Sequence, residues 1–268
     1  MALKLSVLGT GHMASAILDG VFEHGILSPD EVRLFDHSPE RLRRFAEMGC
    51  GIADSARALA ESSRILCAVR PQEFPAAAEL LGELSPDHLL ISVMAGIDSA
   101  TISRHLGGSC RVVRTMPNTG ALIGCSMTAV SAGHGALDSD IEFVDTLFDA
   151  IGRTVDVDEG MLSAATAVSG SGPGWVYLLA SSMIAAAAEV GIDGADADTM
   201  VRQTILAAAR TLDSDDAGVE DLLAGIASKG GTTEAGLAAM RDAGFVESVR
   251  AGIVAARDRG DALGRSDQ

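Results

Sequence analysis

The sequence predicts an α/β domain built on a parallel sheet over residues 1–158, followed by an all-helical domain over residues 159–268. Three observations support this division. Short apolar runs alternate with helical segments in the first half, as in sheets covered by helices on both faces. Strand signals end near Asp158, and Ala, Ser and Gly then dominate long helical stretches. At 268 residues, the chain is long enough for two such domains.

Each strand of the first domain is expected from a short apolar run. The run ILCAV within residues 64–69 has no polar side chain, which is typical of a strand buried on both faces. We expect strands at residues 5–8, 31–35, 64–69, 89–93, 110–115, 127–131 and 154–157. We expect the intervening helices at residues 14–22, 39–47, 74–84, 99–106 and 141–151.

The second domain is expected to contain only helices, at residues 172–190, 196–212, 219–227, 233–242 and 246–259. Between Glu159 and Glu189 the chain has no charged residue. The glycine-rich segment SGSGPG interrupts this stretch, and the remainder is too short to span a membrane comfortably. We therefore expect a helix that is buried in a core or in a dimer interface.

Charge and cysteine usage narrow the class of protein. The formal net charge of −17 argues against binding to nucleic acid or to an anionic membrane surface. The first residues, MALKLSVLGTG, lack the long apolar region and the cleavage site of a signal peptide. The four cysteines form no C-x-x-C pair and have no histidine at zinc spacing, so we expect no metal site. These features favour a cytoplasmic protein with reduced thiols.

A glycine-rich turn follows the first expected strand. Residues 9–14 read GTGHMA, a G-x-G-x-x-A pattern between a strand and a helix. In such turns Gly9 permits the tight bend, Gly11 lets the backbone approach a pyrophosphate, and Ala14 allows close packing of helix on strand. The helix N-terminus, at His12 and Met13, offers N–H groups and a partial positive charge to the phosphates. The pattern predicts dinucleotide binding.

The choice between NADH and NADPH stays open. Asp36 ends the second expected strand, where a carboxylate can accept hydrogen bonds from the adenosine ribose and would repel a 2′-phosphate. Ser38 follows closely, and Arg41, Arg43 and Arg44 lie on the next expected helix. Those arginines are either a phosphate-binding group or a solvated helix face.

Three further loops carry candidate site residues. Met116, Pro117 and Asn118 follow an expected strand, whose carboxyl end should border the nicotinamide. Asn118 could orient the carboxamide or form an Asx turn. The loops at residues 169–173 and 228–233 each precede an expected helix, and successive amides and hydroxyls in the second loop suit a carboxylate. Each of these two loops could also be a simple helix cap.

The whole chain resembles the pyrroline-5-carboxylate reductase family. The resemblance rests on five motifs in order: GTGHMASAI (9–17), AVRPQ (68–72), VVRTMPNTGALIG (112–124), AVSGSGPGWVYLLASSM (167–183) and SKGGTTEAGLAAM (228–240). It implies a Rossmann-like first domain and a helical dimerisation domain, in enzymes that form homodimers and often rings of dimers. It also implies hydride transfer from NADPH or NADH to the C=N bond of 1-pyrroline-5-carboxylate, which gives L-proline in the last step of proline biosynthesis.

The resemblance also implies roles for individual residues. In such enzymes the substrate is a cyclic imine carboxylate. Its carboxylate is held by the loop that matches Ser228, Gly230, Gly231 and Thr232, with Ser171 also at the substrate. The hydroxyl that matches Thr233 lies near the imine nitrogen, so Thr233 or a water could relay the proton. The segment that matches Ala68, Val69, Arg70 and Pro71 lies against the cofactor.

Several positions depart from the family pattern. Lys229 stands where the family normally has proline, Gly120 follows M-P-N-T where proline is common, and Arg70 replaces a usual lysine. Lys229 and Gly120 motivate an alternative, a specialised reductase of another cyclic imine acid. A non-catalytic dinucleotide-binding relative is a further alternative, against which the intact loops at residues 169–173 and 230–233 argue.

Overall fold

The computed structural model describes residues 3–214 and 217–266, which form two compact units. Of the described residues, the first unit comprises 3–171 and 255–266, and the second comprises 172–214 and 217–254. The first unit therefore extends past the expected boundary at residue 158. The cause is a short helix, α6 (Leu162–Ala165), whose Leu162 is buried against Met116 and Ala129 of the sheet.

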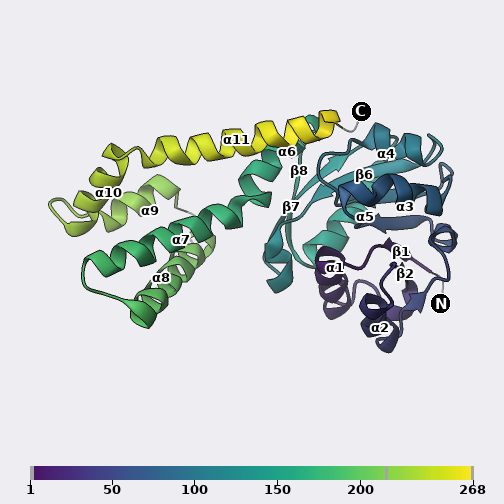
Figure 1. Cartoon of the computed structure of the whole chain (residues 1–268), viewed down its shortest axis with the longest axis horizontal. Coiled ribbons are helices and arrows are strands. Elements are labelled where there is room, and N and C mark those ends of the chain that lie inside the picture. Colours follow the sequence, from purple (N-terminus) through teal and green to yellow (C-terminus); the bar gives the residue numbers. More distant parts are fainter. Residues whose placement is uncertain (1–2, 215–216, 267–268) are drawn as a thin grey trace. The chain divides into compact units, whose positions relative to one another are not determined.

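Within the described residues, eight strands form one sheet in the order β3-β2-β1-β4-β5-β6-β7-β8 (Figure 1). All neighbours are parallel except β6 and β7, which are antiparallel. The connection between these two, residues 117–125, is shorter than the crossover of about a dozen residues that parallel neighbours need. The strands are β1 (Leu5–Leu8), β2 (Val32–Phe35), β3 (Gly51–Ile52), β4 (Arg64–Cys67), β5 (Leu89–Ser92), β6 (Arg111–Met116), β7 (Ser126–Ala132) and β8 (Gly152–Asp156).

Alternate residues of the central strands pack on opposite faces of the sheet. In β4, Leu66 belongs to one hydrophobic core, whereas Ile65 and Cys67 belong to the other. Burial on both faces explains why these strands read as continuous apolar runs. The first core includes α1 (His12–Glu23), α2 (Pro39–Glu47) and α5 (Asp138–Asp149), and the second includes α3 (Phe74–Leu81), α4 (Ser99–His105) and the 3-10 segment η2 (Ala56–Glu61).

The second unit is helical, and its helices α7 and α8 pack against each other (Figure 1). No residue of α7 is buried within the chain, and Tyr177 and Leu178 are each about two-thirds exposed. The expectation of a core helix is therefore wrong, and the interface alternative remains. The helices are α7 (Gly172–Glu189), α8 (Gly194–Ser214), α9 (Val219–Ile226), α10 (Thr232–Asp242) and α11 (Phe245–Ser266), the last ending in the first unit. In the described part of the chain, no helix has the length and apolar character needed to cross a membrane.

Candidate functional site

The turn between β1 and α1 packs tightly against the end of β4. Gly9 has a φ of +88°, a left-handed conformation that favours glycine. A Cβ atom at this position would lie 3.0 Å from the carbonyl oxygen of Ala68 and 3.1 Å from Cγ1 of Val69. The structure thus brings three of the expected cofactor-binding residues together at the carboxyl ends of two adjacent parallel strands.

Gly11 leaves the N-terminus of α1 open. No heavy atom lies within 4 Å of a Cβ built on Gly11, and this N-cap residue has no side chain to accept from the first-turn amides. The first turn, which begins at the exposed His12 and the half-buried Met13, therefore keeps N–H donors and a partial positive charge for a ligand. An open, positive helix end beside a close-packed glycine fits the pyrophosphate of a dinucleotide.

Asp36 lies at the end of β2, beside this turn. Its carboxylate accepts hydrogen bonds from the N–H group (2.7 Å) and the hydroxyl (3.0 Å) of Thr10, and from the N–H group of Ser38 (2.8 Å). Burial alone would raise the pKa of Asp36, but these hydrogen bonds and the Arg41 charge outweigh it and hold the pKa below its ordinary value. Thr10, which sequence reasoning missed, is therefore a main partner of an ionised Asp36.

Arg70 and Pro71 follow β4 at the same edge of the sheet. Arg70 is exposed and directly precedes a short 3-10 turn that Pro71 opens. Because β4 lies next to β1 and runs parallel to it, these residues lie at the same edge of the sheet as the glycine-rich turn. An exposed guanidinium at this edge suits the phosphates of a dinucleotide.

Asn118 joins the loop after β6 to the segment that precedes α7. Its Oδ1 accepts from the N–H group of Gly120 at 2.9 Å, which confirms the Asx turn. Its Nδ2 donates to the carbonyl oxygen of Ser169 at 3.0 Å. The side chain thus holds two candidate site loops together. A contact of Met116, Pro117 or Asn118 with the cofactor stays a prediction.

Gly120 has a structural explanation in this chain. A Cβ atom on Gly120 would lie 2.4 Å from the carbonyl oxygen of Cys125, which is a backbone atom and cannot move independently. The N–H group of Cys125 in turn donates to the Gly120 carbonyl at 2.9 Å. The close approach of these two backbone segments requires glycine, so Gly120 no longer motivates a different substrate.

A π-helical turn carries the segment that Asn118 contacts. Residues Thr166–Gly170 form this turn directly after α6, and the N–H group of Ser171 closes it on the Thr166 carbonyl at 2.7 Å. Such turns interrupt regular helices and are frequent at functional sites. The turn ends at Ser171, an expected substrate-binding residue, which is half-buried.

A cavity of about 370 Å³ lies in the first unit beside the carboxyl ends of β5 and β6. Gly96, Arg114 and Met116 line it, together with residues of α6 and of the last turns of α11. Arg114 is buried, and its Nε has no hydrogen-bond partner among the described residues. The guanidinium group of Arg114 and the side chain of Met116 thus line the same cavity. Met116 is one of the residues predicted from the sequence to border the nicotinamide.

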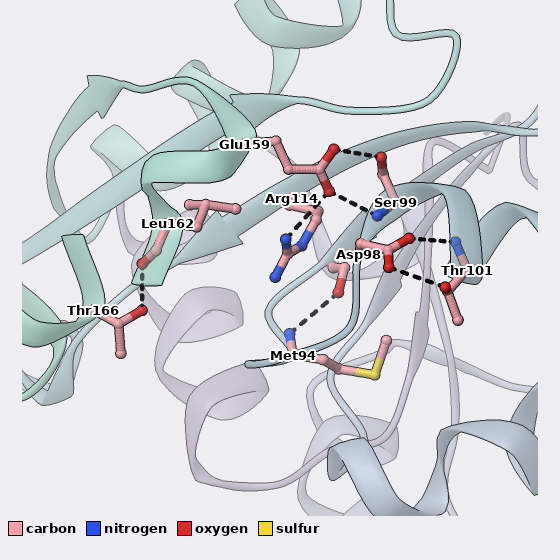
Figure 2. Close-up of polar contacts among 9 residues, drawn as sticks. Met94, Asp98, Ser99, Thr101, Arg114, Glu159, Leu162 and Thr166 are labelled. Carbon is pink, nitrogen blue, oxygen red and sulfur yellow. Dashed lines mark hydrogen bonds and ion pairs between the residues drawn. The ribbon is translucent and has the colours of Figure 1, made fainter. Parts of the chain in front are cut away.

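Glu159 is one of the residues that line this cavity. Its carboxylate accepts from the N–H group and the hydroxyl of Ser99, both at 2.7 Å, and from Nη1 of Arg114 at 3.2 Å. Figure 2 shows these contacts beside Asp98, whose carboxylate caps α4 by accepting from the N–H group of Thr101 at 2.6 Å. Sequence reasoning missed Glu159, because 60 residues separate it from Ser99 and no local pattern links them.

The loop at residues 228–233 lies in the second unit, at the N-terminus of α10. Gly230 has a φ of +75°, and a Cβ on Gly231 would lie 2.6 Å from Oγ of Ser228. The N–H group of Gly231 donates to the Ser228 carbonyl at 2.9 Å, and that of Gly230 donates to Oε2 of Glu234 at 2.7 Å. Both glycine amides are therefore already hydrogen-bonded, one within the loop and one to Glu234 of α10.

The N–H groups that remain available to bind a carboxylate belong to the residues that follow Gly231. Gly231 is the N-cap residue of α10 and has no capping side chain, so the amides of Thr232 and Thr233 face outward from the helix end. Lys229, an exposed residue of the same loop, contributes a positive charge to it. The loop suits an anion, while a direct contact of Gly230 or Gly231 with a substrate stays a prediction.

The expected site residues divide between the two units. Those of the first unit are Gly9, Gly11, His12, Met13, Asp36, Ser38, Ala68, Val69, Arg70, Pro71, Met116, Pro117, Asn118 and Ser171. Those of the second unit are Ser228, Gly230, Gly231, Thr232 and Thr233. Among the described residues, no group of three His, Cys, Asp or Glu side chains is arranged to hold a metal ion.

Two segments of the chain match known families. Residues 159–263 match a family model described as pyrroline-5-carboxylate reductase dimerisation, and residues 4–96 match one described as NADP oxidoreductase coenzyme F420-dependent. The chain is 35% identical to pyrroline-5-carboxylate reductase 2 of Bacillus subtilis, over 92% of this chain and 90% of that protein. The chain belongs to the pyrroline-5-carboxylate reductase family.

Solved structures agree with membership of the pyrroline-5-carboxylate reductase family. The chain superposes on a pyrroline-5-carboxylate reductase from Coxiella burnetii with a TM-score of 0.90 at 26% identity, over 98% of this chain and 99% of that one. It superposes on Plasmodium falciparum pyrroline carboxylate reductase with NADP bound with a TM-score of 0.84 at 27% identity, over 98% of each chain. A Rossmann-like domain followed by a helical dimerisation domain is therefore the fold of this chain.

Proposed function

We propose that this enzyme reduces the C=N bond of 1-pyrroline-5-carboxylate with NADPH or NADH to give L-proline, the last step of proline biosynthesis. The observation that carries this proposal is the presence, in one chain, of two complementary anion-binding features. The open glycine-rich turn at residues 9–14 suits a dinucleotide, and the loop at residues 228–233 suits a carboxylate. The turn lies within the segment that matches the NADP oxidoreductase family model, and the loop lies within the segment that matches the pyrroline-5-carboxylate reductase dimerisation model.

The dihydronicotinamide, when bound, supplies a hydride to C5 of the ring. Gly9 and Gly11 let the backbone reach the pyrophosphate, and the segment at residues 116–118 borders the nicotinamide. Because a protonated imine is already electrophilic, the chain has mainly to position the two reactants and exclude water. This accounts for a site that is built from glycine turns and amides, with few side chains of strong acid or base character.

The substrate is held through its carboxylate. The outward-facing amides at the start of α10 and the ammonium group of Lys229 bind this anion, since a helix N-terminus favours negative charge. The hydroxyl of Thr233, in the first turn of the same helix, hydrogen-bonds to the ring nitrogen and relays a proton to it from water, so that the protonated imine receives the hydride at C5. Ser171 completes the polar contacts to the substrate.

The enzyme acts as a homodimer in the cytoplasm. Helix α7 exposes Tyr177 and Leu178 in the single chain, and burial of such residues against a second copy removes apolar area from water. The four cysteines are free thiols, in keeping with a reducing compartment.

Transfer of a deuterium label tests the reaction. The purified enzyme is given 1-pyrroline-5-carboxylate and NADPH or NADH deuterated at the transferable C4 position, and the product is analysed by mass spectrometry and chiral chromatography. The proposal predicts L-proline with one deuterium at C5. Unlabelled proline, or an absence of proline despite measurable cofactor binding, would contradict it.

A second candidate, the reduction of another cyclic imine acid, is favoured by one observation. Lys229 puts an ammonium group next to the carboxylate loop, which would serve a substrate with an additional or displaced acid group. A panel of five- and six-membered cyclic imine carboxylates, and of the five-membered imine without a carboxylate, separates the two candidates. A kcat/KM at least tenfold higher for another ring than for 1-pyrroline-5-carboxylate would favour the second candidate.

A further inference from the structure

Asp36 occupies the position at which dinucleotide-binding domains use an acidic residue to bind the ribose. It follows Phe35, the last residue of β2, and the Phe35 carbonyl accepts a hydrogen bond from the N–H group of Gly9 at 2.9 Å. The general rule at this position is that a carboxylate accepts from the ribose hydroxyls and disfavours a 2′-phosphate. Whether that rule applies depends on where this carboxylate lies and which donors it already has.

The Asp36 carboxylate is turned inward and is satisfied by the protein. Its side chain is 7% exposed, and Thr10 is also buried. Oδ2 accepts from both the N–H group and the hydroxyl of Thr10, and Oδ1 accepts from the N–H group of Ser38. Asp36 thus links the glycine-rich turn to the loop between β2 and α2, the two loops between which the adenosine half of a dinucleotide is expected.

An exposed positive charge also lies near this carboxylate. Nη1 of Arg41 lies 3.6 Å from Oδ2 of Asp36, and the Arg41 side chain is 56% exposed. The Ser38 hydroxyl makes no capping bond to α2, so the N-terminus of this nine-residue helix is also open. Arg44, by contrast, is paired with Asp19. Among the described residues, Arg41 is the arginine of α2 that forms an ion pair with Asp36, at the expected ribose position.

We infer that Asp36 is a positioning residue that does not select NADH, and that Arg41 and Ser38 bind the 2′-phosphate of NADPH. The inference rests on the proposed function for the presence of a dinucleotide, but it concerns the adenosine end alone. The inward carboxylate holds the two loops together and keeps Arg41 near the ribose. Its oxygens already accept hydrogen bonds from Thr10 and Ser38. The enzyme therefore binds NADPH more tightly than NADH despite the acidic residue after β2.

Binding of cofactor fragments tests this without any turnover of an imine. The probes are adenosine 2′,5′-bisphosphate and ADP, measured by calorimetry on the full-length enzyme. Wild type is expected to bind the bisphosphate about tenfold or more tighter, and Arg41→Gln to lose about tenfold for the bisphosphate only, the scale of one charge-assisted contact. Arg43→Gln, a substitution on the same helix, controls for net charge and should change either affinity less than about twofold.

Asp36→Asn and Thr10→Val test the positioning role. Both variants should weaken the two probes by a similar factor, so that the ratio of their affinities stays within about twofold of the wild-type ratio. Thr10→Val removes only the hydroxyl bond and serves if Asp36→Asn proves too unstable. A rise of tenfold or more in the bisphosphate preference of Asp36→Asn would overturn the inference, as would equal loss of both probes in Arg41→Gln. Fragment binding that follows the prediction in an enzyme without imine reduction would refute the proposed function alone.

Discussion

The side-chain nitrogen of Asn118 donates a hydrogen bond to the carbonyl oxygen of Ser169 at 3.0 Å, across 51 residues of sequence. The same side chain closes an Asx turn through its Oδ1. One amide therefore fixes the loop after β6 relative to the π-helical turn that leads to Ser171. A residue of the M-P-N motif thus acts on the geometry of the site, whatever contact it makes with the cofactor.

Substitution of Asn118 separates these two bonds. Asn118→Asp keeps the Oδ1 acceptor of the Asx turn but loses the donor to Ser169, whereas Asn118→Ala loses both. We expect each variant to lower kcat, with a loss of about 1 kcal/mol of unfolding free energy for the aspartate and about 2 kcal/mol for the alanine. Denaturant unfolding and steady-state kinetics measure these effects. An aspartate variant with wild-type kcat would show that the link to Ser169 does not position the site.

Glu159 is expected to stabilise the first unit. Glu159→Gln keeps the shape of the side chain but removes the charge that accepts from Ser99 and Arg114, and it leaves the buried guanidinium without its anionic partner. We expect a loss of about 2–3 kcal/mol in the free energy of unfolding. Glu47→Gln, at an exposed position at the end of α2, is the matched control and should change stability by less than about 0.5 kcal/mol. Equal stability of the two variants would contradict the assignment.

The carboxylate loop requires glycine at position 231. In Gly231→Ala the new methyl group would meet Oγ and the carbonyl oxygen of Ser228, so the loop must shift. We expect the KM for 1-pyrroline-5-carboxylate to rise about tenfold or more, with the KM for the cofactor nearly unchanged. Gly236→Ala in the same helix α10 meets no atom within 4 Å and should preserve the KM values while stabilising the helix by about 0.5–1 kcal/mol. A substrate KM that is unchanged in Gly231→Ala would argue against this loop as the carboxylate site.

The hydroxyl of Thr233 carries the proposed proton relay. We expect Thr233→Ala to lower kcat about 100-fold, the lower end of the range for a group that transfers a proton in the transition state. Thr233→Ser retains the hydroxyl and should keep kcat within about tenfold of the wild type. Turnover of the alanine variant at the wild-type rate would exclude the role of this hydroxyl, and a serine variant as slow as the alanine would point to the methyl group instead.

The pKa of Asp36 predicts an acid-dependent contribution to stability. Its folded-state pKa is held below the ordinary value of 3.8, so the ionised form stabilises the folded protein. This contribution to stability is fully present once the pH is about one unit above the unfolded-state value of 3.8. It is lost as the pH falls through the lowered folded-state pKa. The difference in unfolding free energy between wild type and Asp36→Asn should therefore be constant between pH 5 and pH 7 and shrink in stronger acid. A difference that grows in acid would reverse the sign of this linkage.

Much of the fold is predictable from the sequence because the sheet is buried on both faces. All seven expected strands are present, each with ends displaced by at most two residues. The two-residue strand β3 (Gly51–Ile52) was not expected, since two residues carry no periodicity. The antiparallel pairing of β7 was also missed, because apolar composition does not encode strand direction. The short connection at residues 117–125 was the available signal for it.

The candidate site shows a different limit. Glycine turns such as those at Gly9 and Gly230 are readable, because a left-handed backbone needs a particular residue. The long-range partners of Asp36, Asn118 and Glu159 are not readable, because each bond joins loops that only the folded sheet brings together. The residues that shape the backbone could therefore be predicted from the sequence, whereas several residues that hold the loops together could not.

Imine reduction can be measured by the loss of dihydronicotinamide absorbance when purified enzyme is mixed with 1-pyrroline-5-carboxylate, with NADPH and NADH run in parallel. We expect saturable turnover with both cofactors, a higher kcat/KM with NADPH, and one proline formed per dihydronicotinamide consumed. No turnover with either cofactor, in a preparation that binds adenosine 2′,5′-bisphosphate, would contradict the proposed function.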